Sequence, residues 1–362
     1  MMQDLKIIVT PPNSNSSDSY PKRHMTQIST DRTERIRGML TGTFMGDAHA
    51  MPAHWYYDRD ALRQDYGWIT EFMSPKGHHP DSILWRSNYS PLNTKGDILH
   101  DQAQYWGQKG IHYHQHLDAG ENTLNLQLAW QLIETIQEAK SYDADRYLER
   151  YRDFMLNPQS HRDTYVEECH RQFFTQYARG RSLKTCGGPD NHIGGLASLP
   201  VLSGLLDGEI ESVRLVAREH LHLTHHHAVV ERAADSLTRI LGDVLQGKEL
   251  QKAIVNHGND FFSLRRAERW ALKPDAEVID HHFSSACYID KAFPASLYLA
   301  WKYAGRFRDG IVANTNIGGD NCHRGAVIGA LLGAEAGQRS IPVAWRRSLL
   351  MTRFLEQLPV FV

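Results

Sequence analysis

The most informative part of this chain is residues 317 to 337, which read IGGDNCHRGAVIGALLGAEAG. Glycine recurs there every four residues, at Gly325, Gly329, Gly333 and Gly337. In a helix these positions share one face, and each interior glycine costs about 1 kcal/mol relative to alanine. A second helix packed backbone to backbone against that face offsets the cost, because small residues four apart allow close approach. The pattern therefore predicts a closely packed helix pair.

A partner for this helix lies near the other end of the chain, where residues 38 to 52 read GMLTGTFMGDAHAMP. Gly38, Gly42 and Gly46 again recur every four residues, and Pro52 is expected to end the helix. If the two helices pack antiparallel, the end of the first lies beside the start of the second. The side chains expected to meet there are Asp47, His49, Asp320, Asn321 and His323. Spacing alone fits a functional site, and it fits equally well two core helices with ordinary capping residues.

The composition is that of a globular protein without a strong charge bias. The 362 residues include 23% charged residues and carry a formal net charge of -2, which does not indicate a nucleic-acid partner. The four cysteines lie far apart without a CxxC pair, which is typical of reduced thiols. No apolar run approaches the roughly 20 residues that a membrane span needs. We therefore expect a cytoplasmic protein without a nucleic-acid or membrane partner.

Local patterns favour an all-α protein after a disordered polar tail over residues 1 to 30. The length allows two domains or a single all-helical domain over residues 31 to 362. Apolar residues recur at helical spacing along most of the chain, whereas strand patterns are scarce. Thr164 and Glu167 form a capping box, which predicts that a helix begins at Thr164.

An irregular stretch from about residue 73 to residue 120 is rich in histidines and aromatic residues. A loop of this length inside a domain is usually functional, and its aromatic content favours an ordered wall or lid. The histidines include His78, His79, His100, His112, His114 and His116. No two of them stand at a helical ligand spacing beside a carboxylate, so we interpret them as part of the wall rather than as metal ligands.

Several segments resemble, in order, the signatures of the ADP-ribosylglycohydrolase family. This family has a compact all-α fold and includes the dinitrogenase-reductase-activating glycohydrolases and the J-type crystallins. Residues 38–52 resemble its opening GxxxGxxxGDAxGxP segment, and residues 119–128 fall at its TDDT stretch. Residues 188–202 resemble its central GNG segment, and residues 223–234 its threonine-histidine helix. Residues 288–337 resemble its closing segment, which contains GGDTDT.

The resemblance implies a metal site with altered ligands. Family members hold two divalent cations between the TDDT and GDTDT segments, where the cations orient the ribose hydroxyls and a water. The corresponding positions here are Gly120, Glu121, Asn122, Asp320, Cys322 and His323. The family has four carboxylates at these positions, and this chain has two. Two carboxylates are a poor ligand set for a pair of Mg²⁺ ions, whereas Cys322 and His323 suit one softer ion. We expect at most one divalent cation (Mg, Mn or Zn), with Asp320, Glu121, Asn122, Cys322 and His323 as candidate ligands.

The resemblance also implies hydrolysis of a ribosyl or ADP-ribosyl bond in a small-molecule or ADP-ribosylated substrate, and we expect this bond to be N-glycosidic. Glu121 and Asp320 remain as a carboxylate pair. One of them would act as the general acid, and the other would act as a general base or stabilise the developing cation. The side chains expected to bind substrate are Asp47, His49, Asn122, Asn191, His192, Asn321 and His225. The alternative is a non-catalytic, crystallin-like binding or structural descendant of the same fold.

Overall fold

The computed structural model describes residues 32–206 and 208–359, so the tail predicted over residues 1 to 30 lies outside the described residues. Over these two ranges the chain forms helices and isolated bridges but no strand, which confirms the predicted all-α class. The helices are α1 (Arg32–Ala50), α2 (Arg59–Tyr66), α3 (Leu124–Ala139), α4 (Ala144–Leu156), α5 (Glu168–Ala178), α6 (Leu199–Leu205), α7 (Ile210–His222), α8 (Ala228–Leu245), α9 (Leu250–His257), α10 (Leu264–Trp270), α11 (Asp275–His282), α12 (Ile289–Lys302), α13 (Phe307–Ile317), α14 (Asn321–Ala336), α15 (Val343–Ser348) and α16 (Thr352–Gln357).

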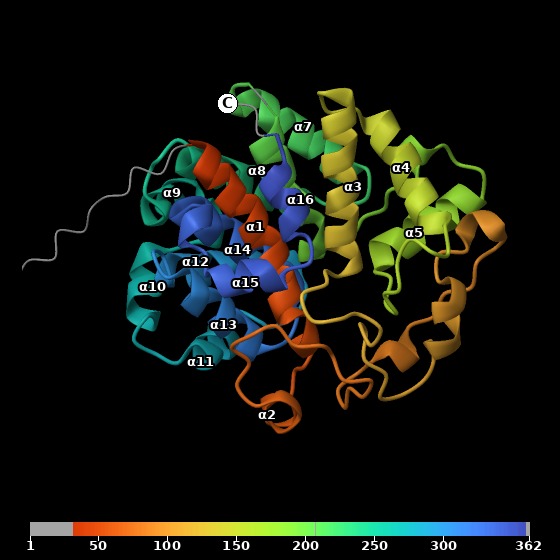
Figure 1. The fold of residues 1–362 in the computed structure, drawn as a ribbon, viewed down its shortest axis with the longest axis horizontal. Coiled ribbons are helices and arrows are strands. Elements are labelled where there is room, and N and C mark those ends of the chain that lie inside the picture. The colour runs from red at the N-terminus through yellow and green to blue at the C-terminus, as the bar shows by residue number, and fades with distance from the viewer. Residues whose placement is uncertain (1–31, 207, 360–362) are drawn as a thin grey trace, which may run out of the picture.

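Helices α1 and α14 pack antiparallel in the middle of the fold, as the glycine spacing predicts (Figure 1). A Cβ atom added to Gly42 would lie 2.0 Å from the carbonyl oxygen of Gly329. One added to Gly46 would lie 2.0 Å from the carbonyl oxygen of Gly325. Because the backbones are this close, only glycine fits at these positions. The C-terminal end of α1 therefore lies beside the N-terminal end of α14.

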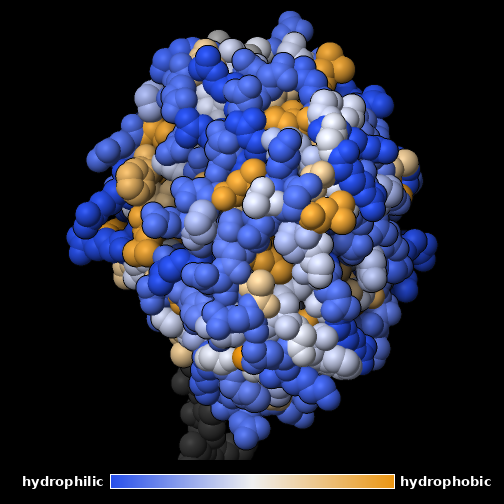
Figure 2. All heavy atoms as spheres, turned by 90° about the vertical axis from the view of Figure 1, so that its right-hand side faces the viewer, coloured by the Kyte–Doolittle hydropathy of each residue, from blue (hydrophilic) through white to orange (hydrophobic). Residues whose placement is uncertain are grey.

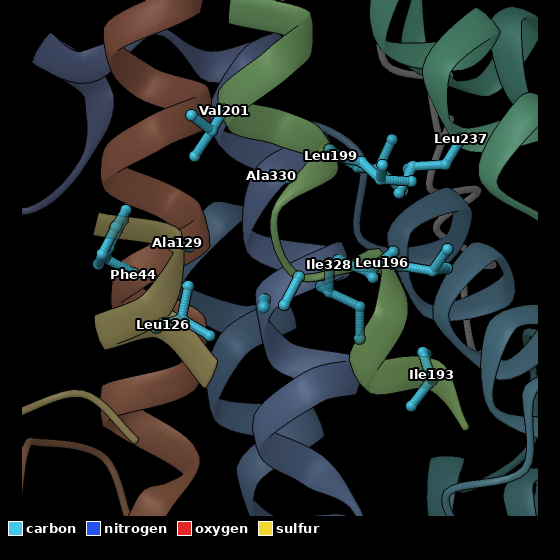
Figure 3. Close-up of a cluster of buried hydrophobic side chains, with 14 of the residues drawn as sticks. Phe44, Leu126, Ala129, Ile193, Leu196, Leu199, Val201, Leu237, Ile328 and Ala330 are labelled. Atoms are coloured by element: carbon cyan, nitrogen blue, oxygen red, sulfur yellow. The ribbon is translucent and has the colours of Figure 1, made fainter. Parts of the chain in front are cut away.

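The hydrophobic core forms around this helix pair (Figure 3). Buried side chains from α1, α3, α6, α8 and α14 gather in one cluster, together with those of the short turn before α6. Its members include Phe44, Leu126, Ala129, Ile193, Leu196, Leu199, Val201, Leu237, Ile328 and Ala330. Such close packing holds the ends of α1, α3 and α14 in defined positions.

The long segment between α2 and α3 is ordered and partly buried, as predicted for a wall. It contains short 3₁₀ turns at Leu84–Arg86, Thr94–Gly96 and His100–Tyr105. His112 is fully buried, and its Nε2 donates to the carbonyl oxygen of Pro52 at 3.1 Å. The segment is thus held against the end of α1.

The surface beside α4 and α5 is mostly hydrophilic, with apolar residues in small separate patches (Figure 2). The large apolar side chains gather in the core instead. Within residues 32–206 and 208–359, every helix falls short of the length or the apolar content that a bilayer span requires.

Candidate functional site

Two glycines determine where α14 begins. Gly318 and Gly319 have φ values of 73° and 65°, a left-handed conformation that glycine adopts without strain. A Cβ atom on Gly319 would lie 2.1 Å from the carbonyl oxygen of Ser285, and the backbone N–H of Asp320 donates to that same oxygen at 2.7 Å. The Asp320 that follows this turn is 0% exposed.

Asp320 and His323 form a buried ion pair. Oδ1 of Asp320 accepts hydrogen bonds from Nδ1 of His323 at 2.7 Å and from Nε2 of His54 at 3.2 Å. Burial raises the pKa of Asp320, but the charge of His323 and these hydrogen bonds outweigh burial and hold the pKa below its ordinary value. Burial disfavours the charged form of His323 as well, yet the charges of Asp320 and Glu167 raise its pKa to about 10. The opposite charges of the pair thus favour each other's ionised form.

A line of buried contacts continues from His54 to the start of α3. Nδ1 of His54 lies 2.6 Å from Nε2 of His114, and Nδ1 of His114 donates to Oδ1 of Asp163 at 2.6 Å. The other oxygen of Asp163 accepts the backbone N–H of Leu124 at 2.9 Å. His54, His114 and Asp163 are all buried. These contacts join segments that are distant in the sequence to Asp320.

On its other side, His323 faces Glu167, the residue before α5. Nε2 of His323 lies 3.3 Å from Oε1 of Glu167, and Oε2 of Glu167 accepts from the amide of Asn125 at 2.8 Å. A Cβ atom on Gly194 would lie 2.7 Å from Oε2, so this glycine leaves room for the carboxylate. Burial raises the pKa of Glu167, and the charge of His323 opposes that rise in part. Two carboxylates thus flank one imidazole ring.

Asp47 and Asn122 connect the end of α1 to the start of α3. Asp47 accepts from the amide of Asn122 at 2.8 Å, and from the backbone N–H and hydroxyl of Thr123 at 2.9 and 2.7 Å. Burial raises the pKa of Asp47, although these hydrogen bonds oppose the rise. The thiol of Cys322 lies 3.6 Å from the backbone carbonyl oxygen of Asp47. Asp47 therefore stabilises the helix start, which is a capping role.

Glu121 forms its ion pair with Arg162. Its Oε2 accepts from the backbone N–H of Asp118 and from Arg162, each at 2.6 Å. It borders a pocket of about 470 Å³ whose lining includes Trp130 and Phe354. The structure therefore does not bring the two carboxylates of the predicted catalytic pair together.

His49 and Asn321 lie at the junction with α13. Nδ1 of His49 is hydrogen-bonded to the hydroxyl of Thr315 at 2.7 Å, and its ring packs against Trp345 at a centroid distance of 4.6 Å. The amide of Asn321 donates to the backbone carbonyl oxygen of Thr315 at 3.0 Å. Both side chains therefore hold helices together at this junction.

Asn191, His192 and His225 surround a third carboxylate, Asp190. Oδ1 of Asp190 accepts from both the backbone N–H and the Nδ1 of His192 at 2.9 Å, while Nε2 of His225 lies 3.5 Å away. Asn191 contributes its backbone carbonyl oxygen, which accepts from the N–H of Ile289 at 3.0 Å. This group lies near Glu167, because the adjacent residues Gly194 and Gly195 border the Glu167 carboxylate and the His225 ring respectively.

The arrangement at the start of α14 can be compared with known proteins. The sequence profile of the ADP-ribosylglycohydrolase family matches residues 28–360. The chain belongs to this family. A solved structure described as an ADP-ribosylglycohydrolase-related protein complex is similar in fold, with a TM-score of 0.60 and 21% identity, over 90% of this chain and 95% of that chain. The comparison with curated proteins gives no match.

Membership of the ADP-ribosylglycohydrolase family supports a glycohydrolase-type function at the level of the family. The two hard cations implied by the family resemblance do not fit the side chains present. Glu121 is bound to Arg162, and Cys322 supplies a soft sulfur inside a small apolar cluster. Mg²⁺ requires several oxygen ligands, and Asp320 is the carboxylate that remains in place. Potential ligand atoms lie within 4.8 Å of one another in two groups here, His54 with His114 and Cys322, and His54 with Asp320 and His323.

Four residues of the cluster around Asp320 are not identified by the sequence patterns: His54, His114, Asp163 and Glu167. The predicted capping box is wrong, because α5 begins at Glu168, and the hydroxyl of Thr164 bonds to Gln102. The carboxylate of Glu167 faces His323 instead. The sequence contains one signal for His54, which stands two residues after Pro52, the end of the family's opening signature.

Proposed function

We propose that this protein hydrolyses a ribosyl or ADP-ribosyl N-glycosidic bond, with Glu167 and Asp320 as the two carboxylates. The observation that carries the proposal is the placement of these carboxylates on opposite sides of His323, at the start of α14. That helix start corresponds to the family's closing signature. A pair of carboxylates with different protonation states is what glycoside hydrolysis requires.

The two carboxylates have different environments, which suits different roles. Burial raises the pKa of Glu167, so this group retains a proton to higher pH and can donate it to the leaving nitrogen. Asp320 stays ionised beside His323 and can stabilise positive charge at the sugar carbon. Water then adds to that carbon, and its released proton restores Glu167.

Access to this site is through Glu167 and Tyr57. The side chain of Glu167 is 15% exposed, whereas that of Asp320 is 0% exposed. Tyr57 is 45% exposed, and it follows Tyr56, whose carbonyl oxygen accepts from the backbone N–H of Gly319, the residue before Asp320, at 2.7 Å. We propose that substrate enters beside Tyr57, and that the side chains covering Asp320 move to admit it.

A non-catalytic binding protein is the second candidate. It is favoured by the complete burial of Asp320, whose Oδ1 is already bonded to two histidines. In that case a ribosyl compound would bind without being cleaved.

The test is release of ADP-ribose from an arginine-linked ADP-ribosyl peptide and from ADP-ribosylarginine. We expect Glu167→Gln and Asp320→Asn each to lower turnover by about 100-fold or more, because each removes an acid-base or electrostatic group. Glu121→Gln separates the two possible carboxylate pairs, and we expect it to retain turnover because Glu121 faces Arg162. Wild-type turnover in Glu167→Gln would exclude the proposed proton donor.

Two further outcomes identify the alternatives. Loss of turnover in Glu121→Gln, with unchanged unfolding free energy, would restore the pair predicted from the sequence. Saturable binding of ADP-ribose by the wild-type protein, without product from either substrate, would support the non-catalytic candidate.

A further inference from the structure

A group of three possible metal ligands lies at the first turn of α5. One ligand atom from each of Cys169, Asp190 and His225 lies within 4.8 Å of the other two. The three residues are 1%, 5% and 3% exposed, so all of them are buried. They come from α5, from the loop between α5 and α6, and from the turn between α7 and α8. None of them is a candidate ligand at the start of α14.

Backbone hydrogen bonds bring Asp190 and His225 together. The carbonyl oxygen of Gly188 accepts from the N–H of His226 at 2.8 Å and from the N–H of Asp190 at 2.9 Å. In this arrangement Oδ1 of Asp190 and Nε2 of His225 are 3.5 Å apart. That separation is longer than an ordinary hydrogen bond to a carboxylate. It is close to the value of about 3.3 Å expected for two ligand atoms that each lie about 2.0 Å from one tetrahedral ion.

The ring of His225 is oriented as a metal ligand requires. Its Nε2 is buried and has no hydrogen-bond partner within residues 32–206 and 208–359. Its Nδ1 lies 2.8 Å from the hydroxyl of Thr224. A histidine that binds a metal usually donates its other N–H to a fixed oxygen, and the Thr224 hydroxyl is in that position. With the hydrogen on Nδ1, the lone pair of Nε2 faces the carboxylate of Asp190, which is unfavourable unless a cation lies between them.

Asp190 and Cys169 can both bind a cation here. His192 donates its backbone N–H and its Nδ1 to Oδ1 of Asp190, both at 2.9 Å, which orients the carboxylate. An ionised carboxylate can accept at about four positions, so these two bonds leave room for an ion. Burial and the charge of Asp190 raise the pKa of Cys169, so its thiolate form requires a cation beside the sulfur.

His170 is a less suitable ligand than His225. One of its ring nitrogens also lies within 4.8 Å of the sulfur of Cys169. However, its Nδ1 is hydrogen-bonded to the hydroxyl of Tyr151 at 2.8 Å, and its Nε2 donates to the amide oxygen of Asn125 at 2.9 Å. A cavity of about 40 Å³ borders both Cys169 and His225, and it is large enough for a water molecule as a fourth ligand.

We propose that Cys169, Asp190 and His225 bind one zinc ion, with a water as the fourth ligand. Zn²⁺ accepts sulfur, nitrogen and carboxylate ligands in tetrahedral geometry, and a thiolate and a carboxylate balance its charge. The ion joins α5 to the α5–α6 loop and to the start of α8. Because Glu167 stands two residues before Cys169, the ion also fixes the start of α5 near that carboxylate. The proposal does not depend on the proposed hydrolytic activity, and its test does not measure turnover.

The first measurement is the zinc content of the purified full chain by elemental analysis. We expect one zinc per chain in the wild type and little zinc in Cys169→Ser, which keeps the size of the side chain. Two variants serve as matched controls and should keep their zinc. Cys186→Ser changes another buried cysteine, whose thiol bonds to the carbonyl oxygen of Ser182, and Cys322→Ser changes the buried cysteine at the start of α14. Zinc in Cys322→Ser distinguishes this site from the cation that the family resemblance implies.

Cobalt provides a spectroscopic test at the same site. Co²⁺ added to the zinc-free chain should produce a thiolate-to-cobalt absorption band, which Cys169→Ser abolishes and both controls retain. Thr224→Val keeps all three ligands but removes the hydroxyl beside Nδ1 of His225, so it should keep the band and weaken zinc affinity by about 10- to 100-fold. Should Cys169→Ser fail to fold, the wild type and Thr224→Val still test the site. A chelator should then lower the melting temperature of the wild type.

Three outcomes would overturn the proposal. One is a wild-type chain without zinc that shows no thiolate band when titrated with Co²⁺, which would leave Asp190 and His225 as a direct ion pair. Another is full zinc content in a folded Cys169→Ser chain. The third is zinc that is lost from Cys322→Ser and kept by Cys169→Ser, which would place the ion at the start of α14.

Discussion

At the scale of single residues, Asp320 shows how a buried carboxylate keeps its charge. Burial favours the neutral acid, but His323 and His54 both donate hydrogen bonds to Oδ1 of Asp320. Removing one partner of a buried charged pair leaves the other uncompensated, and this is strongly destabilising. Asp320→Asn keeps the shape of the side chain but removes the charge that His323 faces, so the unfolding free energy of this variant is measured together with its turnover.

His49 makes a prediction about acid sensitivity. Burial lowers its pKa in the folded protein from 6.5 to about 4. The unfolded chain therefore binds more protons between these pH values, and stability falls as the pH falls through this window. We expect His49→Asn, which can still bond to Thr315, to lose this dependence. The stability advantage of the wild type over the variant should shrink by about 2 kcal/mol between pH 7 and pH 5.

Urea unfolding of both proteins at the two pH values checks this prediction. If the unfolding free energies of the two proteins changed equally with pH, His49 would not titrate as described. Turnover at neutral pH serves as the control and should not change. His49 is hydrogen-bonded to Thr315 and packs against Trp345, so it is not expected to contact substrate.

At the scale of elements, the α1–α14 pair is the part of the fold that least tolerates larger side chains. Backbone atoms of the two helices meet at Gly38, Gly42, Gly46 and their partners, so no side chain can adjust to relieve a clash. Close packing of this kind places the end of α1, with Asp47, next to the start of α14. A shift between the two helices would therefore disturb the site directly.

Gly42→Ala tests this packing. The added methyl group would lie 2.0 Å from the carbonyl oxygen of Gly329, so the helices must separate, and we expect a loss of at least about 3 kcal/mol. Gly242→Ala makes the same change inside α8, where the nearest atom is the flexible end of Ile210 at 2.6 Å. There the gain in helix propensity offsets the local crowding, and we expect stability within about 1 kcal/mol of the wild type.

Denaturant unfolding of the two glycine variants provides the comparison. Equal losses in both would mean that the effect belongs to helix glycines in general. A stable Gly42→Ala chain would show that the backbones can separate without penalty.

At the scale of the whole molecule, the fold joins two distant ends of the chain. The guanidinium of Arg35 in α1 donates to the carbonyl oxygen of Ala334 in α14, across a sequence separation of 299 residues. The core around these helices also includes side chains of α3, α6 and α8. Long-range contacts of this kind form only after most of the chain has been brought together.

Truncation tests this dependence. A chain that ends at Gly319 lacks α14, so the glycine face of α1 and the core residues around it have no partner. We expect this chain to show no cooperative thermal transition, whereas the full chain unfolds cooperatively. Calorimetry on both provides the measurement, and a cooperative transition in the shortened chain would contradict the role given to α14.

The amino-acid pattern alone was sufficient for the all-α class, the family resemblance and the close packing of α1 against α14, whereas the antiparallel direction was assumed from it and came from the structure. Glycine spacing is a local property, and it reports directly on which face of a helix allows close approach. It also placed Asp320 and His323 at the start of α14, where the structure has them. These predictions depend only on periodicity and on the order of segments.

Packing in three dimensions was needed for the partners of Asp320. His54 and His114 are separated by 60 residues, and His54 and Asp320 by 266, so no local pattern relates them. The directions of Glu121 and Glu167 likewise depend on Arg162 and on the space left by Gly194. Side-chain direction and burial arise from contacts between distant segments, which is why the chemistry of the site became visible only in the folded chain.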